Sequence, residues 1–282
     1  MGGLCVRRAR VEDRAKVLQV EALSTPNLRY LGAVFEHWVH DQVGELIVAE
    51  LEGEMVGVGK LTVVPDGSAW LEALRVIPAA QGQGVGKRFY ERFFEIAAAR
   101  RIPSMRMYTG IRNAASKGLA ERYGFHLAAT YRGSSVQLRE FTGEYPDDFA
   151  FVQVTDPDRA SKLLLPEKPA WNGFLVMNRT FYELTPTLCG EWAREGKVYY
   201  EAATDSLLVL GARFQADLGL HLSCLGGNLQ RCLAFAARAA RFSAAPKLFC
   251  LFPPQAAEIE QALLQSGFGL DSSDYIVMEI SL

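Results

Sequence analysis

Hydrophobic positions along the first 140 residues follow two spacings, and these predict helices that alternate with strands. Apolar side chains three to four residues apart predict helices over 11–23, 28–41, 85–102 and 113–124. Short apolar runs rich in β-branched residues predict strands over 4–9, 70–78, 104–110 and 125–133, with a hairpin within 45–67 that turns at Glu52-Gly53-Glu54. The predicted order is β, α, α, three β, a glycine-rich turn, then α, β, α, β. Such an order is typical of an α/β domain with a mixed sheet.

The second half of the chain repeats part of this pattern. Residues 104–125 align without a gap with residues 247–268, which places Gly124-Phe125 on Gly267-Phe268. Upstream, the sequence pattern of residues 197–214 resembles that of the hairpin within 45–67. Residues 220–225 likewise resemble the strand over 70–78, and residues 228–242 the helix over 85–102. A duplication therefore predicts two tandem domains, 1–143 and 150–282, with an acidic and proline-rich segment between them.

Composition and charge exclude several classes of function. The 282 residues carry 30 basic and 32 acidic side chains, a formal charge of -2, so a nucleic acid partner is not expected. The five cysteines form no CxxC pair, and among the four histidines only His37 and His40 are close in the sequence, so no metal is expected. Cys224, Cys232 and Cys250 lie in apolar runs and are interpreted as core residues.

Two further expectations concern location. The N-terminal sequence MGGLCVRRAR has no apolar stretch of signal-peptide length, and no run approaches 18 apolar residues. We therefore expect neither secretion nor membrane insertion. The unpaired cysteines favour a reduced, cytoplasmic compartment.

The segment Gln81–Lys87, QGQGVGK, is the strongest chemical signal in the sequence. It joins a predicted strand to a predicted helix, and a helix N-terminus offers unpaired N–H groups to an anion when glycines allow close approach. Arg88 excludes a Walker loop, which needs serine or threonine there, and Lys87 occupies the last glycine position of a dinucleotide fingerprint. Taken alone, the loop is either a plain connection or a phosphate cradle.

Residues 72–86, EALRVIPAAQGQGVG, resemble the signature of the GNAT superfamily of acyl-CoA-dependent N-acyltransferases. In that signature a strand ending in V-x-P precedes [QR]-x-x-G-x-[GA] at the start of a helix. Gln81, Gly84 and Gly86 occupy its constant positions, and Asn113 with the helix ending at Gly124-Phe125 resembles a second family segment. The equivalent turn of the second half, LGGNLQRC, lacks these residues, so that half resembles a degenerate GNAT domain. The tandem order also resembles that of histidine N-acetyltransferase-type members.

The resemblance implies an acetyl-CoA site in the first half. Main-chain N–H groups of the loop would hold the pyrophosphate, the backbone of Leu74, Arg75 and Val76 would pair with the pantetheine arm, and Asn113 would orient the cofactor. The implied cofactor-binding set is therefore Leu74, Arg75, Val76, Gln81, Gly82, Gln83, Gly84, Val85, Gly86, Lys87 and Asn113.

Acetyl transfer to an amine also needs a base and a proton donor. Glu72, in the strand before the loop, matches a glutamate frequent in the family. It either acts as the base or binds the substrate amine, or it is an exposed or structural residue. The N–H of Val76 would polarise the thioester carbonyl. Ala120 stands where many members carry the tyrosine that protonates the sulfur, so Tyr123 and Tyr108 are the remaining side-chain candidates. Protonation by water and departure of the thiolate itself are the alternatives.

The implied function is transfer of an acetyl group from acetyl-CoA to a primary amine of a small molecule, such as an amino acid or another metabolite. Acetylation of proteins or peptides is the second possibility, and a non-catalytic acyl-CoA sensor is the third. The acceptor and the oligomeric state, monomer or homodimer, stay open at this level.

Overall fold

The computed structural model describes residues 3–26, 28–144 and 148–282, and its chain folds into two compact units. The first consists of Met1–Thr109, Asn113–Leu127 and Met278–Leu282, and the second of Gly110–Arg112 and Ala128–Val277. These units differ from the predicted division into 1–143 and 150–282. The reason is that strand β6 (His126–Gln137) runs from the first unit into the second, and the last residues of the chain return to the first.

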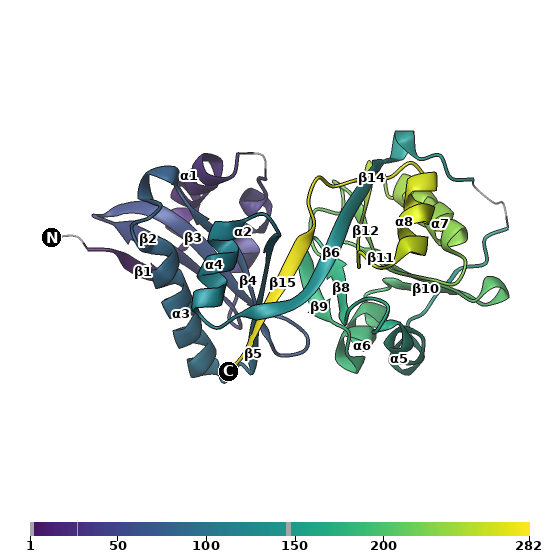
Figure 1. The fold of residues 1–282 in the computed structure, drawn as a ribbon, viewed down its shortest axis with the longest axis horizontal. Coiled ribbons are helices and arrows are strands. Elements are labelled where there is room, and N and C mark those ends of the chain that lie inside the picture. Colours follow the sequence, from purple (N-terminus) through teal and green to yellow (C-terminus); the bar gives the residue numbers. More distant parts are fainter. Residues whose placement is uncertain (1–2, 27, 145–147) are drawn as a thin grey trace. The chain divides into compact units, whose positions relative to one another are not determined.

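The first unit has the predicted order of elements (Figure 1). Its strands are β1 (Cys5–Arg8), β2 (Glu45–Leu51), β3 (Glu54–Val63), β4 (Ala69–Val76) and β5 (Ser104–Gly110), and its last residues belong to β15 (Tyr275–Ser281). Its helices are α1 (Arg14–Ser24), α2 (Leu31–Val39), α3 (Val85–Arg100) and α4 (Ala114–Arg122). Neighbouring strands from β1 to β4 are antiparallel, and β4 and β5 are parallel, so the sheet is mixed.

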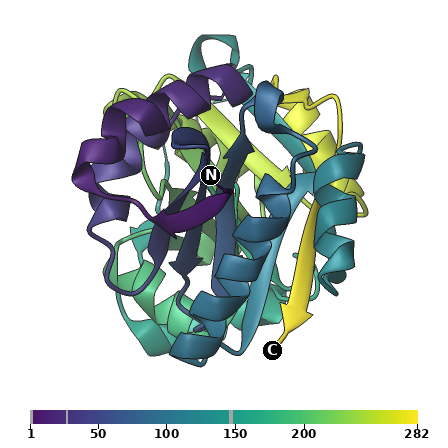
Figure 2. The ribbon, with the colours of Figure 1, turned by 90° about the vertical axis from the view of Figure 1, so that its left-hand side faces the viewer.

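The two faces of this sheet carry different side chains. Gly57 and Gly59 of β3 lie under α3, where a Cβ on Gly57 would come within 2.8 Å of Phe89. Their lack of a side chain lets the helix pack closely on this face. The opposite face carries α1 and is the more polar, with Lys60 and Glu72 directly opposite each other on β3 and β4. Figure 2 shows α1 and α2 in purple and α3 in blue.

A β-bulge in β4 changes which of its residues share a face. Val58 pairs with Arg75 and Lys60 pairs with Glu72, so two steps along β3 match three steps along β4. Ala73 takes the extra position with a φ of 55°, in the left-handed region. In a regular strand residues three apart point to opposite faces, but the bulge brings Glu72 and Arg75 to the same face.

The second unit also has a mixed sheet, in the order β6-β13-β12-β11-β10-β7, in which only β12 and β13 are parallel. Its other strands are β7 (Val152–Gln153), β8 (Phe174–Met177), β9 (Thr180–Glu183), β10 (Val198–Glu201), β11 (Ser206–Gly211), β12 (Leu220–Gly226), β13 (Lys247–Phe252) and β14 (Gly269–Leu270). Its helices are α5 (Pro157–Leu164), α6 (Pro186–Arg194), α7 (Leu229–Phe242) and α8 (Ala257–Gln265).

The predicted repeat is confirmed in the fold. Helix α4 starts at Ala114 and α8 starts at Ala257, the same separation as between β5 and β13. The sequence pattern missed α5, α6 and the hairpin β8–β9, which forms its own two-stranded sheet. Among the described residues no helix combines the length and apolar character that crossing a membrane requires.

Candidate active site

The loop Gln81–Lys87 leads directly into α3, as predicted, and its glycines have the backbone geometry that the sequence suggested. Gly82 and Gly84 have φ values of 78° and 83°, and a Cβ on either would meet no atom within 4 Å. Gly86 packs closely instead, because a Cβ there would come within 2.9 Å of Leu119. The loop surface at Gly82 and Gly84 is therefore open to a ligand.

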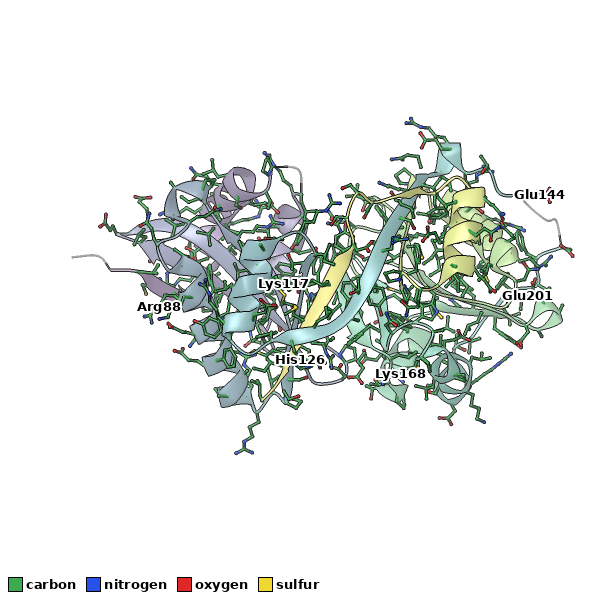
Figure 3. The ribbon with its side chains drawn as sticks, in the orientation of Figure 1. Arg88, Lys117, His126, Glu144, Lys168 and Glu201 are labelled. Carbon is green, nitrogen blue, oxygen red and sulfur yellow. The ribbon has the colours of Figure 1, made fainter. Side chains whose placement is uncertain are left out.

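The start of α3 keeps its first N–H groups available. Gly84 is the N-cap and has no side chain to cap the helix, and its carbonyl accepts the N–H of Arg88. The N–H groups that precede this bond point out of the helix end and carry its partial positive charge. Arg88, labelled in Figure 3, is half exposed and pairs with Glu91 at 2.7 Å. This end of the helix can accommodate an anion.

The edge of β4 that precedes the loop is unpaired on one side. The parallel pairing with β5 covers Ala69–Leu71 and extends no further in the described residues. The N–H of Ile77 bonds to the carbonyl of Val56, so in an antiparallel ladder the N–H of its neighbour Val76 points away from β3. Val76 therefore directs its N–H into the gap between β4 and β5, where an extended ligand can add hydrogen bonds.

Glu72 lies at the point where β4 and β5 separate. Its side chain is buried, and its Oε1 accepts a hydrogen bond from the hydroxyl of Thr62 at 2.5 Å. Tyr108 is two residues beyond the parallel pair Trp70 and Arg106, so it lies across the gap from Glu72 on the same face. Its ring stacks on that of Trp70 with centroids 5.9 Å apart. A carboxylate and a phenol therefore lie on the same face where the pairing of β4 with β5 ends.

Arg75 has a role in the structure that its backbone position did not suggest. Its guanidinium is buried, pairs with Glu21 of α1 and lies 4.7 Å above the ring of Tyr30. Glu21 Oε1 also accepts the N–H groups of Tyr30 and Leu31, at 2.8 and 3.0 Å. Burial, then the charge of Glu72, raises the pKa of the Tyr30 hydroxyl, so it stays protonated at neutral pH.

Two further predicted residues, Asn113 and Tyr123, lie at the two ends of α4. Asn113 caps this helix, because its Oδ1 accepts the N–H of Ser116 at 3.2 Å. Tyr123 donates its hydroxyl to the carbonyl of Lys87 at 3.0 Å, and its ring stacks on Tyr90 with centroids 4.8 Å apart. This packing gives Tyr123 a structural role between α4 and α3. Ala120 is fully buried.

The corresponding helix start in the second unit is occupied by protein groups. Asn228 caps α7, since its Oδ1 accepts the N–H of Arg231 at 3.2 Å, and a Cβ on Gly227 would lie 2.0 Å from the carbonyl oxygen of Asp205. Arg231 is itself bound to Glu201, labelled in Figure 3, at 2.5 and 2.7 Å. The anion-accepting geometry of the first loop is therefore missing from the second.

The cysteines of the second unit belong to its core. Cys189, Cys224, Cys232 and Cys250 are all buried, and burial raises the pKa of each thiol, to about 11 for Cys189 and about 12 for Cys232. The interpretation of Cys224, Cys232 and Cys250 as core residues is confirmed. Within the described ranges no group of three or more histidine, cysteine or acidic side chains is arranged to hold a metal ion.

Residues 12–125 match the family model described as Acetyltransferase (GNAT) family. The first unit belongs to the GNAT acetyltransferases. This membership agrees with the open loop, the bulge and the separated strands described above, and it assigns this unit to a class of acyltransferases. The sequence matches no curated protein.

Solved structures extend the GNAT likeness to the whole chain. A GCN5-related N-acetyltransferase from Sphaerobacter thermophilus has a TM-score of 0.67 at 12% identity, over 99% of this chain and 95% of its own. A tandem GNAT protein from the clavulanic acid biosynthesis pathway has a TM-score of 0.66 at 12% identity, over 99% and 98%. At these identities the likeness shows the fold, and that fold is the predicted tandem GNAT arrangement.

Sequence reasoning missed one buried ion pair of this GNAT unit. Glu21 and the guanidinium of Arg75 are both buried and pair with each other beside the ring of Tyr30, although Glu21 and Arg75 are far apart in the sequence. No pattern in a single sequence links them, because their meeting depends on α1 packing against the bulged part of β4.

Proposed function

We propose that this protein transfers the acetyl group of acetyl-CoA to a primary amine of a small molecule, and that the first unit carries the reaction. The observation that supports this most directly is the continuity of two features. The unpaired edge of β4 leads, within a few residues, to the uncapped start of α3. A ligand with an extended arm joined to a phosphate group would bond through the arm to the edge of β4 and through the phosphate to the start of α3.

The proposed contacts with the cofactor follow from this geometry. The loop Gln81–Lys87 would hold the pyrophosphate, with open space above Gly82 and Gly84. The backbone of Leu74–Val76 would pair with the pantetheine arm. Asn113 would orient the cofactor in addition to its role as a helix cap.

The proposed chemistry uses three groups of the same region. Glu72, directly or through a water molecule, accepts a proton from the acceptor ammonium, and the neutral nitrogen attacks the thioester carbonyl carbon. The N–H of Val76 stabilises the oxyanion that forms. When the C–S bond breaks, Tyr108 donates its proton to the leaving sulfur, and the phenolate that remains takes up, directly or through water, the second proton that the nitrogen loses as the amide forms. The location of Tyr108 across the gap from Glu72 favours it over Tyr123, whose hydroxyl bonds to Lys87.

A thiol-release assay tests the proposal. Acetyl-CoA is offered with free amino acids, polyamines, aminoglycosides and peptides, and free coenzyme A is followed over time. We expect turnover with at least one small amine and little with peptides. Binding of acetyl-CoA without turnover on any amine would contradict the proposal and favour a sensor.

A pair of glycine variants tests the placement of the pyrophosphate. Gly84→Asp introduces a negative charge at the start of α3 and should abolish acetyl-CoA binding in calorimetry. Gly53→Asp is the matched control, because Gly53 has a similar φ of 87° and equally open surroundings at a hairpin turn. Both variants carry the same backbone strain. Equal affinities for acetyl-CoA in the two variants would refute the assigned loop.

A further inference from the structure

Arg75 presents an unused hydrogen-bonding edge. Its side chain is 4% exposed, and only Nη1 takes part in the pair with Glu21. Its Nε and Nη2 have no hydrogen-bond partner among the described residues, although buried polar groups are rarely left unsatisfied. Among all the residues that the structure describes, Trp171 Nε1 is the only side-chain nitrogen or oxygen that is fully buried and has no partner. The Nε and Nη2 atoms of Arg75 are therefore not fully buried.

The geometry of this edge selects a type of ligand. Nε and Nη2 lie side by side in the plane of the guanidinium and form a fork of two parallel N–H bonds. Such a fork matches the two oxygens of a carboxylate, and charge-assisted bidentate pairs are among the strongest hydrogen bonds in proteins. Glu21 and the ring of Tyr30 hold the guanidinium in place, so little side-chain freedom is lost on binding.

The unused edge lies close to the carboxylate proposed to accept the proton. The bulge at Ala73 brings Glu72 and Arg75 to the same face of β4. Both charges act on the hydroxyl of Tyr30, since Glu72 raises its pKa and Arg75 lowers it. The two groups therefore converge on one region of this face, with opposite charges.

We propose that Arg75 binds the carboxylate of the acceptor through its Nε–Nη2 edge, and that the acceptor is a free amino acid or a compound with the same adjacent amine and carboxylate. This inference rests on the proposed acetyl transfer and specifies its substrate class. The ammonium end of such a molecule faces Glu72 while the carboxylate end faces Arg75. A residue at the N-terminus of a peptide has an amide in place of that carboxylate and leaves the guanidinium edge unsatisfied.

Matched substrates test this inference without any mutation. Each free amino acid is compared with its own α-carboxamide, which has the same side chain and amine but no carboxylate. We expect kcat/KM to be roughly 10- to 100-fold higher for the acid, the size of a hydrogen bond to a charged group. The carboxamide is the less basic amine and has more of the neutral form, so reactivity alone would favour it. Equal or better use of the carboxamide would overturn the inference while leaving acetyl transfer intact.

A pair of conservative variants assigns the discrimination to Arg75. Arg75→Lys keeps the positive charge for Glu21 but removes the planar fork, and the ratio of kcat/KM between acid and carboxamide should fall at least several-fold. Arg106→Lys changes another buried arginine of the same sheet, bound to Ser68 at 2.9 Å and Glu279 at 2.8 Å, and should leave the ratio unchanged. The ratio does not depend on the fraction of folded enzyme. An unchanged ratio in Arg75→Lys would refute the assignment. Turnover of other amines by the wild type, with none of the amino acids or their carboxamides, would refute the inference, whereas no turnover of any amine would refute acetyl transfer itself.

Discussion

The buried pair between Glu21 and Arg75 allows a quantitative prediction about stability. The substitution Glu21→Gln keeps the size of the side chain and an oxygen for the N–H groups of Tyr30 and Leu31, but removes the negative charge. Arg75 then remains charged with its side chain only 4% exposed. The substitution therefore isolates the electrostatic part of the contact.

The expected cost follows from the burial of both partners. Removing one member of a buried ion pair costs about 3–5 kcal/mol, because the other charge stays desolvated and uncompensated. A domain has a free energy of unfolding of only about 5–15 kcal/mol, so the loss is a large part of the total. Glu36→Gln is the control, since the pair of Glu36 with Arg14 is 3.7 Å long and exposed on both sides. Its cost should be within about 0.5 kcal/mol.

Hydrogen exchange followed by mass spectrometry in increasing urea is the appropriate assay, because it reports the first unit separately from the second. Peptides from α1 and β4 should exchange at lower urea in Glu21→Gln than in the wild type, and those from β11 and β12 should be unaffected. A change below about 1 kcal/mol would show that the pair is effectively solvated, and the argument from burial would fail.

Three further predictions concern the site and the second unit. Tyr108→Phe should lower kcat roughly 100-fold or more. Tyr123→Phe should keep kcat within a few-fold of the wild-type value, and should lower the free energy of unfolding by about 1 kcal/mol because its hydrogen bond is lost. Equal effects of the two substitutions on kcat would contradict the assignment of Tyr108 as the proton donor. Calorimetry should find one acetyl-CoA per chain, since Asn228 caps the second helix start, and a stoichiometry of two would refute this. Burial lowers the pKa of His221 from its usual 6.5 to about 4. Between these values the unfolded chain binds a proton that the folded chain does not, so the stability of the second unit should fall as pH drops from about 6.5 to 4. The urea midpoint of His221→Phe should no longer fall over this pH range. A variant with the same pH profile as the wild type would contradict the prediction.

Local sequence accounts for much of the fold. The helices of the first unit and the repeat of β5 and α4 in β13 and α8 follow from hydrophobic spacing and from glycine and proline at their ends. The hairpin β8–β9 and helix α6 were missed, because short apolar runs do not distinguish helix from strand.

The boundaries of the two units could not be predicted from the sequence. The chain returns at Met278–Leu282 to the first unit, where Glu279 accepts a hydrogen bond from Arg106 at 2.8 Å and the N–H of Leu282 bonds to the carbonyl of Pro103 at 2.9 Å. No local sequence pattern predicts that the chain returns to the first unit. A strand finds its neighbours through long-range hydrogen bonds, and a linear division at the repeat boundary therefore assigns the last residues of β15, from Met278 on, to the other unit.

For the candidate site, the sequence by itself determined the loop Gln81–Lys87. A glycine-rich turn between a strand and a helix can be predicted from residues that are neighbours in the chain. It also identified Glu72 and Tyr108 as candidates, although not their relation to each other. Only the tertiary structure decided that these two lie across one gap, that the bulge at Ala73 turns Arg75 to the face of Glu72, and that Glu21 holds it there. Helix and turn signals depend on neighbours in the chain, whereas the meeting of charges from α1 and β4 depends on how the helix packs on the sheet.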